Sequence, residues 1–195
     1  MSRLDLVVGP NGAGKSTFVR LTLAREVPAS VFVNADEIAR REWPDDPVGH
    51  SYDAAARAAE TRQRLIEQHR PFIAETVFSH PSKLTLIDDA RAAGYYVALH
   101  VLMVPESLAV ARVQARVAAG GHDVPTEKIT ARYQRLWDLV ADAVRVADTA
   151  SFWDNAHRDG PALVAFFEDG FIVGEPSWPE WAPAALLTRW DSSPR

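Results

Sequence analysis

The chain has 195 residues, of which 47% are hydrophobic and 24% charged, so at this length one globular domain over residues 1–195 is expected. The net charge of −5, without a block of Lys or Arg, argues against nucleic-acid binding as the main role. The absence of cysteine excludes disulfides and thiolate metal sites. No apolar run approaches the ~20 residues that cross a bilayer, and the first predicted strand leaves no room for a signal peptide. We therefore expect no membrane partner and a cytoplasmic location.

The first predicted strand, residues 4–8, leads into a glycine-rich segment, and a helical apolar pattern follows over residues 16–25. The segment matches the phosphate-binding P-loop pattern, and its residues are Gly9, Pro10, Asn11, Gly12, Ala13, Gly14, Lys15, Ser16 and Thr17. In such a loop the backbone N–H groups surround the phosphates, the lysine reaches the β/γ-phosphates and the Ser16 hydroxyl can bind Mg²⁺. The helix dipole also points at the anion. The sequence thus predicts a nucleoside triphosphate site.

Strands and helices alternate along the rest of the chain. The predicted strands are 31–33, 72–78 and 95–104, and the predicted helices are 49–70, 81–93, 105–118 and 126–146. Shorter features are a helix start at 34–41, loops at 45–47 and 120–125, a short strand or turn at 151–155, and a terminal hairpin formed by 162–167 and 171–173. The tail from residue 175 is expected to be irregular, with its tryptophans packed over the core. This order predicts an α/β P-loop fold with a mostly parallel central sheet, flanking helices and a small C-terminal β-hairpin.

Two acidic residues follow predicted strands at the edge where a P-loop holds its nucleotide. Asp36 comes after the strand 31–33, and Glu75 lies late in the strand 72–78. The carboxyl ends of parallel strands share one edge of the sheet, so both carboxylates are expected beside the P-loop. A kinase uses a carboxylate there to orient an acceptor hydroxyl and accept its proton. Either residue could do so while the other positions the substrate or the Mg²⁺ water shell. The alternative for Asp36 is an N-cap of the next helix.

Arginines that could stabilise a transferring phosphoryl group follow in the third quarter of the chain. Arg112 and Arg116 are four residues apart on one helix face, just before the glycines of 120–125, which could hinge a lid. Arg132 follows on the next helix. The alternative for these arginines is a solvated basic face. His122 is a phosphate donor or a plain loop residue, and the other histidines lack the spacing of metal ligands, so no structural metal is expected.

Five blocks together resemble the zeta toxin family, most closely its short bacterial members that consist of the kinase core. The blocks are residues 9–17, 33–36, 74–79, 112–117 and 120–125, and the resemblance runs from about residue 3 to residue 155, leaving the hairpin and tail at 156–195. The resemblance implies a P-loop kinase related to the chloramphenicol phosphotransferases. It implies transfer of the γ-phosphate of ATP or GTP, with Mg²⁺, to a hydroxyl of a UDP-N-acetyl amino sugar.

The resemblance also implies residue roles. Asp36 takes the place of the catalytic carboxylate, Lys15 and Ser16 act in the P-loop, and Arg112 or Arg116 is the lid arginine. The residues expected around the substrate are Asn34, Glu75, Thr76, Ser79, His122 and Arg132. The chain departs from the longer toxins at His122, where they carry a second lid arginine, so Arg132 or Arg116 would supply that charge. An antitoxin is a candidate partner. The alternative functions are an antibiotic or metabolite phosphotransferase, or a nucleotide-binding module of a toxin–antitoxin pair with little turnover.

Overall fold

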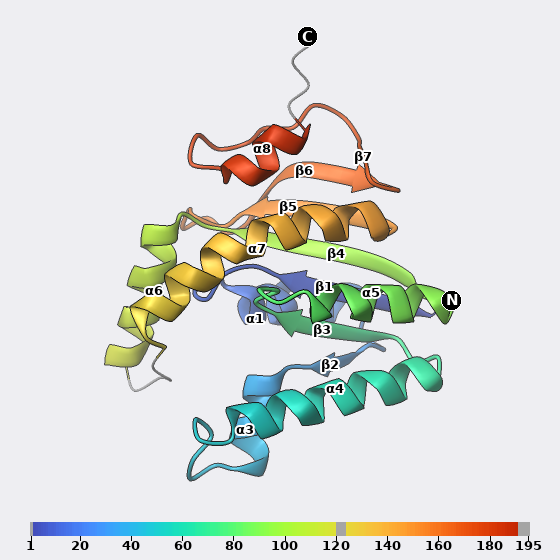
Figure 1. The fold of residues 1–195 in the computed structure, drawn as a ribbon, viewed down its shortest axis with the longest axis vertical. Helices are drawn as coiled ribbons and strands as arrows, with labels where there is room; N and C mark the ends of the chain where they lie inside the picture. Colours follow the sequence, from blue (N-terminus) through green and yellow to red (C-terminus); the bar gives the residue numbers. More distant parts are fainter. Residues whose placement is uncertain (1, 120–123, 191–195) are drawn as a thin grey trace.

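The centre of the molecule is a seven-stranded sheet in the order β2-β3-β1-β4-β5-β6-β7 (Figure 1). The computed structural model describes residues 2–119 and 124–190. The strands are β1 (Arg3–Val8), β2 (Val31–Val33), β3 (Phe72–Thr76), β4 (Tyr96–Met103), β5 (Thr149–Asp154), β6 (Ala162–Glu168) and β7 (Phe171–Ile172). Strands β1 to β5 pair in parallel, and β6 and β7 are antiparallel. The predicted α/β fold with a mostly parallel sheet is therefore confirmed.

Helices cover both faces of this sheet. They are α1 (Lys15–Phe18), a π-helical turn η1 (Val19–Leu23), α2 (Ala24–Glu26), α3 (Ala35–Glu42), α4 (Ser51–Glu67), α5 (Ser82–Ala92), α6 (Glu106–Ala118), α7 (Thr126–Val146) and α8 (Ala184–Trp190). Figure 1 shows α4, α5 and α7 on the near face and α1 behind the sheet. Val7 packs with Phe18 of α1, whereas its neighbour Leu6 packs in a cluster with Ile87 of α5 and Leu136 of α7. Because side chains alternate along a strand, one buried strand supplies both core layers.

The C-terminal third differs from the sequence prediction. Strand β5 spans Thr149–Asp154 and pairs with β4, so the short strand or turn expected at 151–155 is a full strand. Strand β6 pairs with β5, so the predicted hairpin extends the central sheet. The tail also contains α8, where irregular chain was expected. As predicted, its aromatics cover the core: the Trp190 ring lies 4.7 Å from that of Phe167 and 6.0 Å from that of Phe152. Packing of Leu186 and Trp190 against the core, rather than helix propensity, explains α8.

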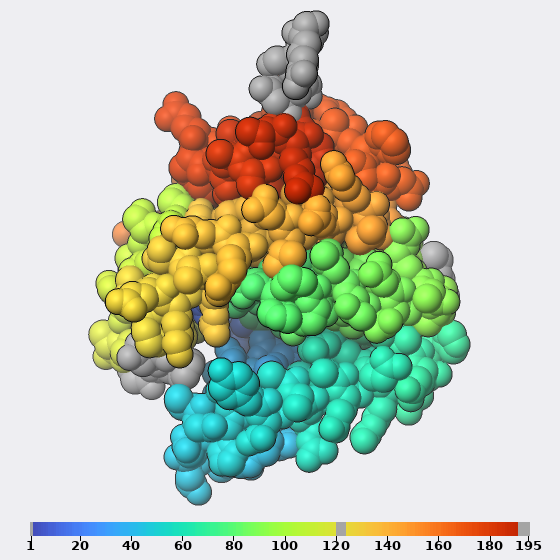
Figure 2. Space-filling view, in the orientation of Figure 1, coloured from blue at the N-terminus to red at the C-terminus, as the bar shows by residue number. Residues whose placement is uncertain are grey.

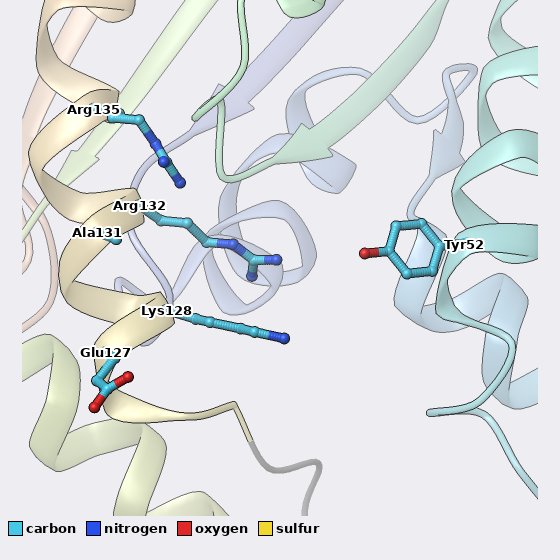
Figure 3. Close-up of a pocket in the computed structure, with 6 residues that line it drawn as sticks. All are labelled: Tyr52, Glu127, Lys128, Ala131, Arg132 and Arg135. Atoms are coloured by element: carbon cyan, nitrogen blue, oxygen red, sulfur yellow. The ribbon is translucent and has the colours of Figure 1, made fainter.

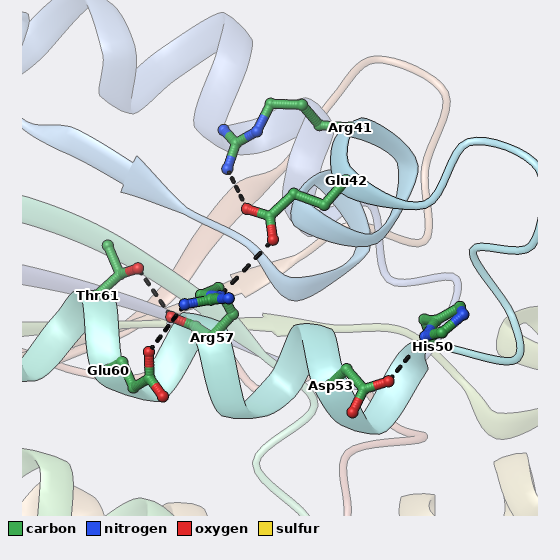
Figure 4. Close-up of polar contacts among 7 residues, drawn as sticks. All are labelled: Arg41, Glu42, His50, Asp53, Arg57, Glu60 and Thr61. Atoms are coloured by element: carbon green, nitrogen blue, oxygen red, sulfur yellow. Dashed lines mark hydrogen bonds and ion pairs between the residues drawn. The ribbon is translucent and has the colours of Figure 1, made fainter.

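Helices α3 and α4 form a unit beside β2, at one end of the sheet. Figure 4 shows the polar contacts on its surface: Arg57 lies 3.7 Å from Glu42 of α3 and 3.4 Å from Glu60, and the His50 ring lies 2.8 Å from Asp53. Exposed ion pairs of this kind contribute about 0–1 kcal/mol each, so the buried apolar side chains between the helices dominate. The unit matters for function because it carries Asp36 at the start of α3.

None of the helices within residues 2–119 and 124–190 is long and apolar enough to cross a membrane.

Candidate nucleotide and acceptor site

The P-loop lies between β1 and α1 with its glycines in left-handed conformations. Gly12 has φ 76° and Gly14 has φ 85°, and Gly14 is the residue that precedes the first turn of α1. A Cβ on Gly14 would lie 2.6 Å from Nδ2 of Asn155, and one on Gly12 would lie 2.6 Å from the carbonyl oxygen of Ala109. Both positions therefore require glycine for backbone conformation and for space. The sequence did not indicate that Asn155, at the end of β5, would contact the P-loop.

Lys15 is folded back into the P-loop. Its side chain is buried, and Nζ donates hydrogen bonds to the carbonyl oxygens of Gly9 (3.0 Å) and Pro10 (2.9 Å). Burial lowers the pKa of Lys15 from its ordinary value of 10.5, because desolvation disfavours the ammonium form. An anion at the loop would stabilise the ammonium form and raise this pKa again.

Charged side chains from four other elements lie close enough to Lys15 to act on its pKa. Burial has the largest effect on the pKa of Lys15. The carboxylates of Glu75 and Asp36 raise that pKa, and the guanidinium groups of Arg116 and Arg132 lower it. These residues come from β3, α3, α6 and α7. The structure thus brings together two carboxylates and two arginines that the sequence prediction placed around one phosphoryl group.

The end of β3 contacts the P-loop directly. The Ser16 hydroxyl donates to Glu75 Oε2 (2.8 Å) and also lies 3.1 Å from Oε1. Asn34 donates from Nδ2 to Glu75 Oε2 (2.7 Å), and its Oδ1 accepts from the backbone N–H of Glu37 (3.1 Å). Asn34 is therefore the N-cap of α3, and the alternative reading of Asp36 as that cap is wrong. Asp36 lies exposed in the first turn of α3 and is free of the capping role.

The pair of Ser16 and Glu75 fits a magnesium ion. A hydroxyl and a carboxylate are the oxygen donors that Mg²⁺ takes in proteins, and here they lie 2.8 Å apart beside the phosphate-binding loop. The Ser16 proton is directed to Glu75, so the lone pairs of Oγ remain available to a cation.

The other predicted site residues have more varied surroundings. The Thr76 hydroxyl accepts from the backbone N–H of Phe78 (3.3 Å), whose φ of 62° marks a tight turn after β3, and Ser79 lies half-buried in that turn. Arg112 Nη1 lies 3.4 Å from the carbonyl oxygen of Gly12, which connects α6 to the P-loop. His122 and the glycines of the predicted lid fall outside the described residues.

A pocket of about 320 Å³ opens between α4 and α7. Figure 2 shows the hollow between these helices, with part of the N-terminal chain visible behind it. The lining residues are Tyr52, Glu127, Lys128, Ala131, Arg132 and Arg135. Figure 3 shows Lys128, Arg132 and Arg135 projecting from one face of α7 towards Tyr52, which is 88% exposed on α4.

The sequence prediction missed part of this pocket. The spacing of Lys128, Arg132 and Arg135 is that of one helix face and could have indicated a cationic stripe. Tyr52 gave no such signal, because only the tertiary fold places it opposite that stripe.

Comparisons with known proteins agree with this architecture. An uncharacterised protein of Haemophilus influenzae is 30% identical over 126 residues, which are 64% of this chain and 88% of the relative. A chain of the AvrRxo1-ORF1:ORF2 complex with ATP superimposes with a TM-score of 0.69 at 14% identity, over 90% of this chain and 61% of that one. A chain of the PezAT toxin–antitoxin system of Streptococcus pneumoniae gives 0.61 at 16% identity, over 85% and 72%.

At these identities the solved structures show a shared fold, and this chain spans only about three fifths of the AvrRxo1 chain. The model of the AAA domain family matches residues 4–139, which include the P-loop, β3 with Glu75 and most of α7. The chain therefore belongs to this AAA domain family of P-loop proteins.

Proposed function

We propose that this protein is a kinase that transfers the γ-phosphate of ATP or GTP to a hydroxyl of a small anionic acceptor. One observation carries the proposal: Glu75 is hydrogen-bonded to Ser16 of the P-loop (2.8 Å), and Asp36, in the first turn of α3, is close enough to the buried P-loop lysine to act on its pKa. A module that only binds nucleotide has no need of an acid beside the γ-phosphate, whereas a kinase acting on a hydroxyl does.

The donor side of the reaction rests on the P-loop. The backbone N–H groups of the loop hold the phosphates, and Lys15 leaves the carbonyls of Gly9 and Pro10 to meet the β/γ-phosphates. Ser16 and Glu75 would hold Mg²⁺, which when bound neutralises charge on the phosphates. The loop is rigid where its glycines leave no room for a side chain, so the phosphates are held in one position.

The acceptor side rests on Asp36. Its carboxylate orients the acceptor hydroxyl and takes the proton as the acceptor oxygen forms a bond to the γ-phosphorus. The bond between that phosphorus and the β–γ bridging oxygen breaks, and the nucleoside diphosphate leaves. Arg112, Arg116 and Arg132 are our candidates for stabilising the charge on the equatorial oxygens.

The pocket between α4 and α7 is our candidate acceptor site. Lys128, Arg132 and Arg135 match an acceptor that already carries phosphate, and the ring of Tyr52 offers a face for stacking. A UDP-N-acetyl amino sugar or a related nucleotide sugar meets these requirements. Thr76, Ser79 and His122 are the remaining candidates for substrate contacts.

A protein partner is part of the proposal. The PezAT structure is that of a toxin–antitoxin system, and it shares the fold of this chain. We propose the cytoplasm, where nucleoside triphosphates and nucleotide sugars coexist, as the place of action and an antitoxin as the partner.

The proposal is tested by measuring phosphoryl transfer from ATP and GTP, with Mg²⁺, to a panel of acceptors. The panel contains UDP-N-acetylglucosamine, free N-acetylglucosamine and hydroxylated antibiotics. We expect transfer to the UDP sugar, a loss of about 10²–10⁴-fold in Asp36→Asn with nucleotide affinity kept, and loss of nucleotide binding in Lys15→Ala. If no acceptor raises turnover and Asp36→Asn changes nothing, the protein is a binding module. If only an antibiotic accepts phosphate, the nucleotide-sugar assignment is wrong.

A further inference from the structure

We propose that Asn34 is a positioning residue that couples the metal-side carboxylate, Glu75, to the acceptor-side carboxylate, Asp36. The Nδ2 end of the Asn34 amide binds Glu75, and the Oδ1 end caps the helix that carries Asp36. The proposal rests on the proposed function for the roles of the two carboxylates, but its central test does not require an acceptor.

Both ends of the Asn34 amide are hydrogen-bonded inside the protein. Nδ2 donates to Glu75 Oε2 (2.7 Å), Oδ1 accepts from the N–H of Glu37 (3.1 Å), and the residue is only 6% exposed. If the Asn34 amide were flipped, Oδ1 would face the Glu75 carboxylate and Nδ2 would face the N–H of Glu37, and both contacts would be repulsive. Both partners therefore favour the same amide orientation. The side chain therefore has one position, and both neighbours depend on it.

The sheet register explains why Asn34 lies at this point. Val33 of β2 is paired in parallel with Ala74 of β3, so Asn34 and Glu75, the next residues on each strand, emerge side by side at the sheet edge. The chain enters α3 directly after Asn34, and Asp36 lies in the first turn of that helix. A shift of the β3 end is thus transmitted to the position of Asp36.

The Glu75 carboxylate is held from two sides. Its Oε2 accepts from Ser16 (2.8 Å) and from Asn34 (2.7 Å). The Asn34 bond is charge-assisted and half-buried, which places it among the stronger side-chain hydrogen bonds. When the Ser16 hydroxyl turns to a cation, Asn34 still keeps the carboxylate beside the P-loop. We infer that it preorganises the Mg²⁺ ligands.

Of the residues that can cap a helix, only asparagine both accepts from the Glu37 N–H and carries a donor that reaches Glu75. Serine would still cap α3, because its hydroxyl accepts from the same N–H, but it is too short to reach Glu75. Aspartate would also cap, but it would set a second carboxylate against Glu75. Alanine would lose both contacts. Asn34→Ser therefore separates the bond to Glu75 from the helix cap, and Asn34→Ala removes both.

The experiment measures Mg²⁺ affinity in the presence of saturating ADP, by calorimetry, with no acceptor. For Asn34→Ser we expect an Mg²⁺ dissociation constant raised about tenfold and a moderate fall in melting temperature, because one charge-assisted hydrogen bond is lost and the cap is kept. For Asn34→Ala we expect the same loss of Mg²⁺ affinity and a larger fall in melting temperature, because the cap is lost as well.

A second arm tests whether Asn34 acts through Glu75. In a Glu75→Gln background, adding Asn34→Ser should change Mg²⁺ affinity by less than about twofold, because the carboxylate it holds is gone. Unchanged Mg²⁺ affinity in Asn34→Ser would show that Asn34 is a helix cap and nothing more. An equal effect with and without Glu75→Gln would show that it acts by another route.

Turnover then tests the link to Asp36. Where an acceptor is known, saturating Mg²⁺ should restore the transfer rate of Asn34→Ser but not that of Asn34→Ala, whose α3 start is loosened. Equal recovery of both variants would remove Asp36 from the proposal. If no acceptor is found, the proposed function fails while the Mg²⁺ measurements still decide whether Asn34 holds the metal side.

Discussion

The side-chain amide of Asn155 donates a 2.8 Å hydrogen bond to the backbone carbonyl of Ala13, 142 positions earlier in the chain. Asn155 is itself anchored, because its N–H donates to the carbonyl of Met103 at the end of β4 (2.9 Å). The end of β5 thus braces the P-loop before any nucleotide arrives. A loop that is already ordered loses less conformational entropy on binding.

Replacing Asn155 should weaken nucleotide binding. Asn155→Ala removes a hydrogen bond of about 0.5–1.5 kcal/mol, so we expect ATP affinity to fall by about two- to tenfold, measured by calorimetry. The control is Gln63→Ala, which removes an exposed amide contact to Glu67 on α4 and should leave affinity unchanged. Equal affinities of Asn155→Ala and the original protein would show that the brace does not order the loop.

Two glycines allow a matched test of the P-loop. Gly14 and Gly94 both have positive φ, 85° and 78°, but a Cβ on Gly94 meets nothing within 4 Å whereas one on Gly14 meets Asn155. Each alanine substitution should destabilise the fold by roughly 1 kcal/mol through backbone strain. Only Gly14→Ala should also abolish nucleotide binding. A Gly94→Ala variant with impaired binding would mean that the effect is one of general stability.

Nucleotide binding should be accompanied by proton uptake in alkaline buffer. Burial lowers the pKa of Lys15 in the empty loop, and the negative phosphates must raise it. As the pH rises towards the depressed pKa, a growing fraction of the unliganded protein lacks this proton and takes it up on binding. The number of protons follows from calorimetry in buffers of different ionisation enthalpy. Lys15→Arg keeps its charge throughout and should show no such uptake; the same uptake in this variant would point to another group.

The cationic face of α7 should determine acceptor affinity. Lys128→Gln and Arg135→Gln each remove a charge from the pocket, so we expect the acceptor KM to rise by about three- to tenfold with little change in kcat or in ATP affinity. Arg145→Gln, on an exposed position of the same helix beyond the pocket, is the matched control. A KM that does not respond to the pocket variants would place the acceptor elsewhere.

A buried ion pair in the central strand β1 should set the acid limit of stability. Burial pushes the pKa of Asp5 upward, but hydrogen bonds and charge from His100 (3.0 Å) and Arg3 (2.7 Å) outweigh it, and the pKa lies below 3.8. Because the folded pKa is depressed, this stabilisation is present above pH 3.8 and is lost as pH falls through the folded value.

Asp5→Asn should therefore lower the free energy of unfolding at neutral pH by about 1.5–3 kcal/mol and flatten its decline in acid. Urea unfolding across this pH range measures both effects. An acid decline of the same slope in Asp5→Asn would assign it to other carboxylates.

Much of the fold followed from local pattern. The glycine spacing of the P-loop, the apolar strand before it and the helix after it act over a few residues, so the sequence alone predicted a phosphate site and the parallel α/β sheet. The same reasoning failed where packing decided the outcome. Helix α8 forms in a Pro- and Trp-rich tail, where Leu186 is buried and Trp190 packs against Phe152 and Phe167, and no periodic signal marks that burial.

The candidate residues could likewise be named from local sequence, but their roles could not. Asp36 and Glu75 could be named because each lies at or after the end of a strand, yet the sequence left open whether Asp36 was a site residue or the cap of the next helix. The structure shows that Asn34 is the cap, through the N–H of Glu37, and the register of β2 on β3 brings the same side chain to Glu75, 41 positions away. Tyr52 and Asn155 reach the site only through chain segments far apart in sequence. The sequence determined which chemical groups this protein has at the ends of its strands; the tertiary structure alone decided which of them meet, because hydrogen bonds and pockets between distant segments leave no periodic trace in either segment.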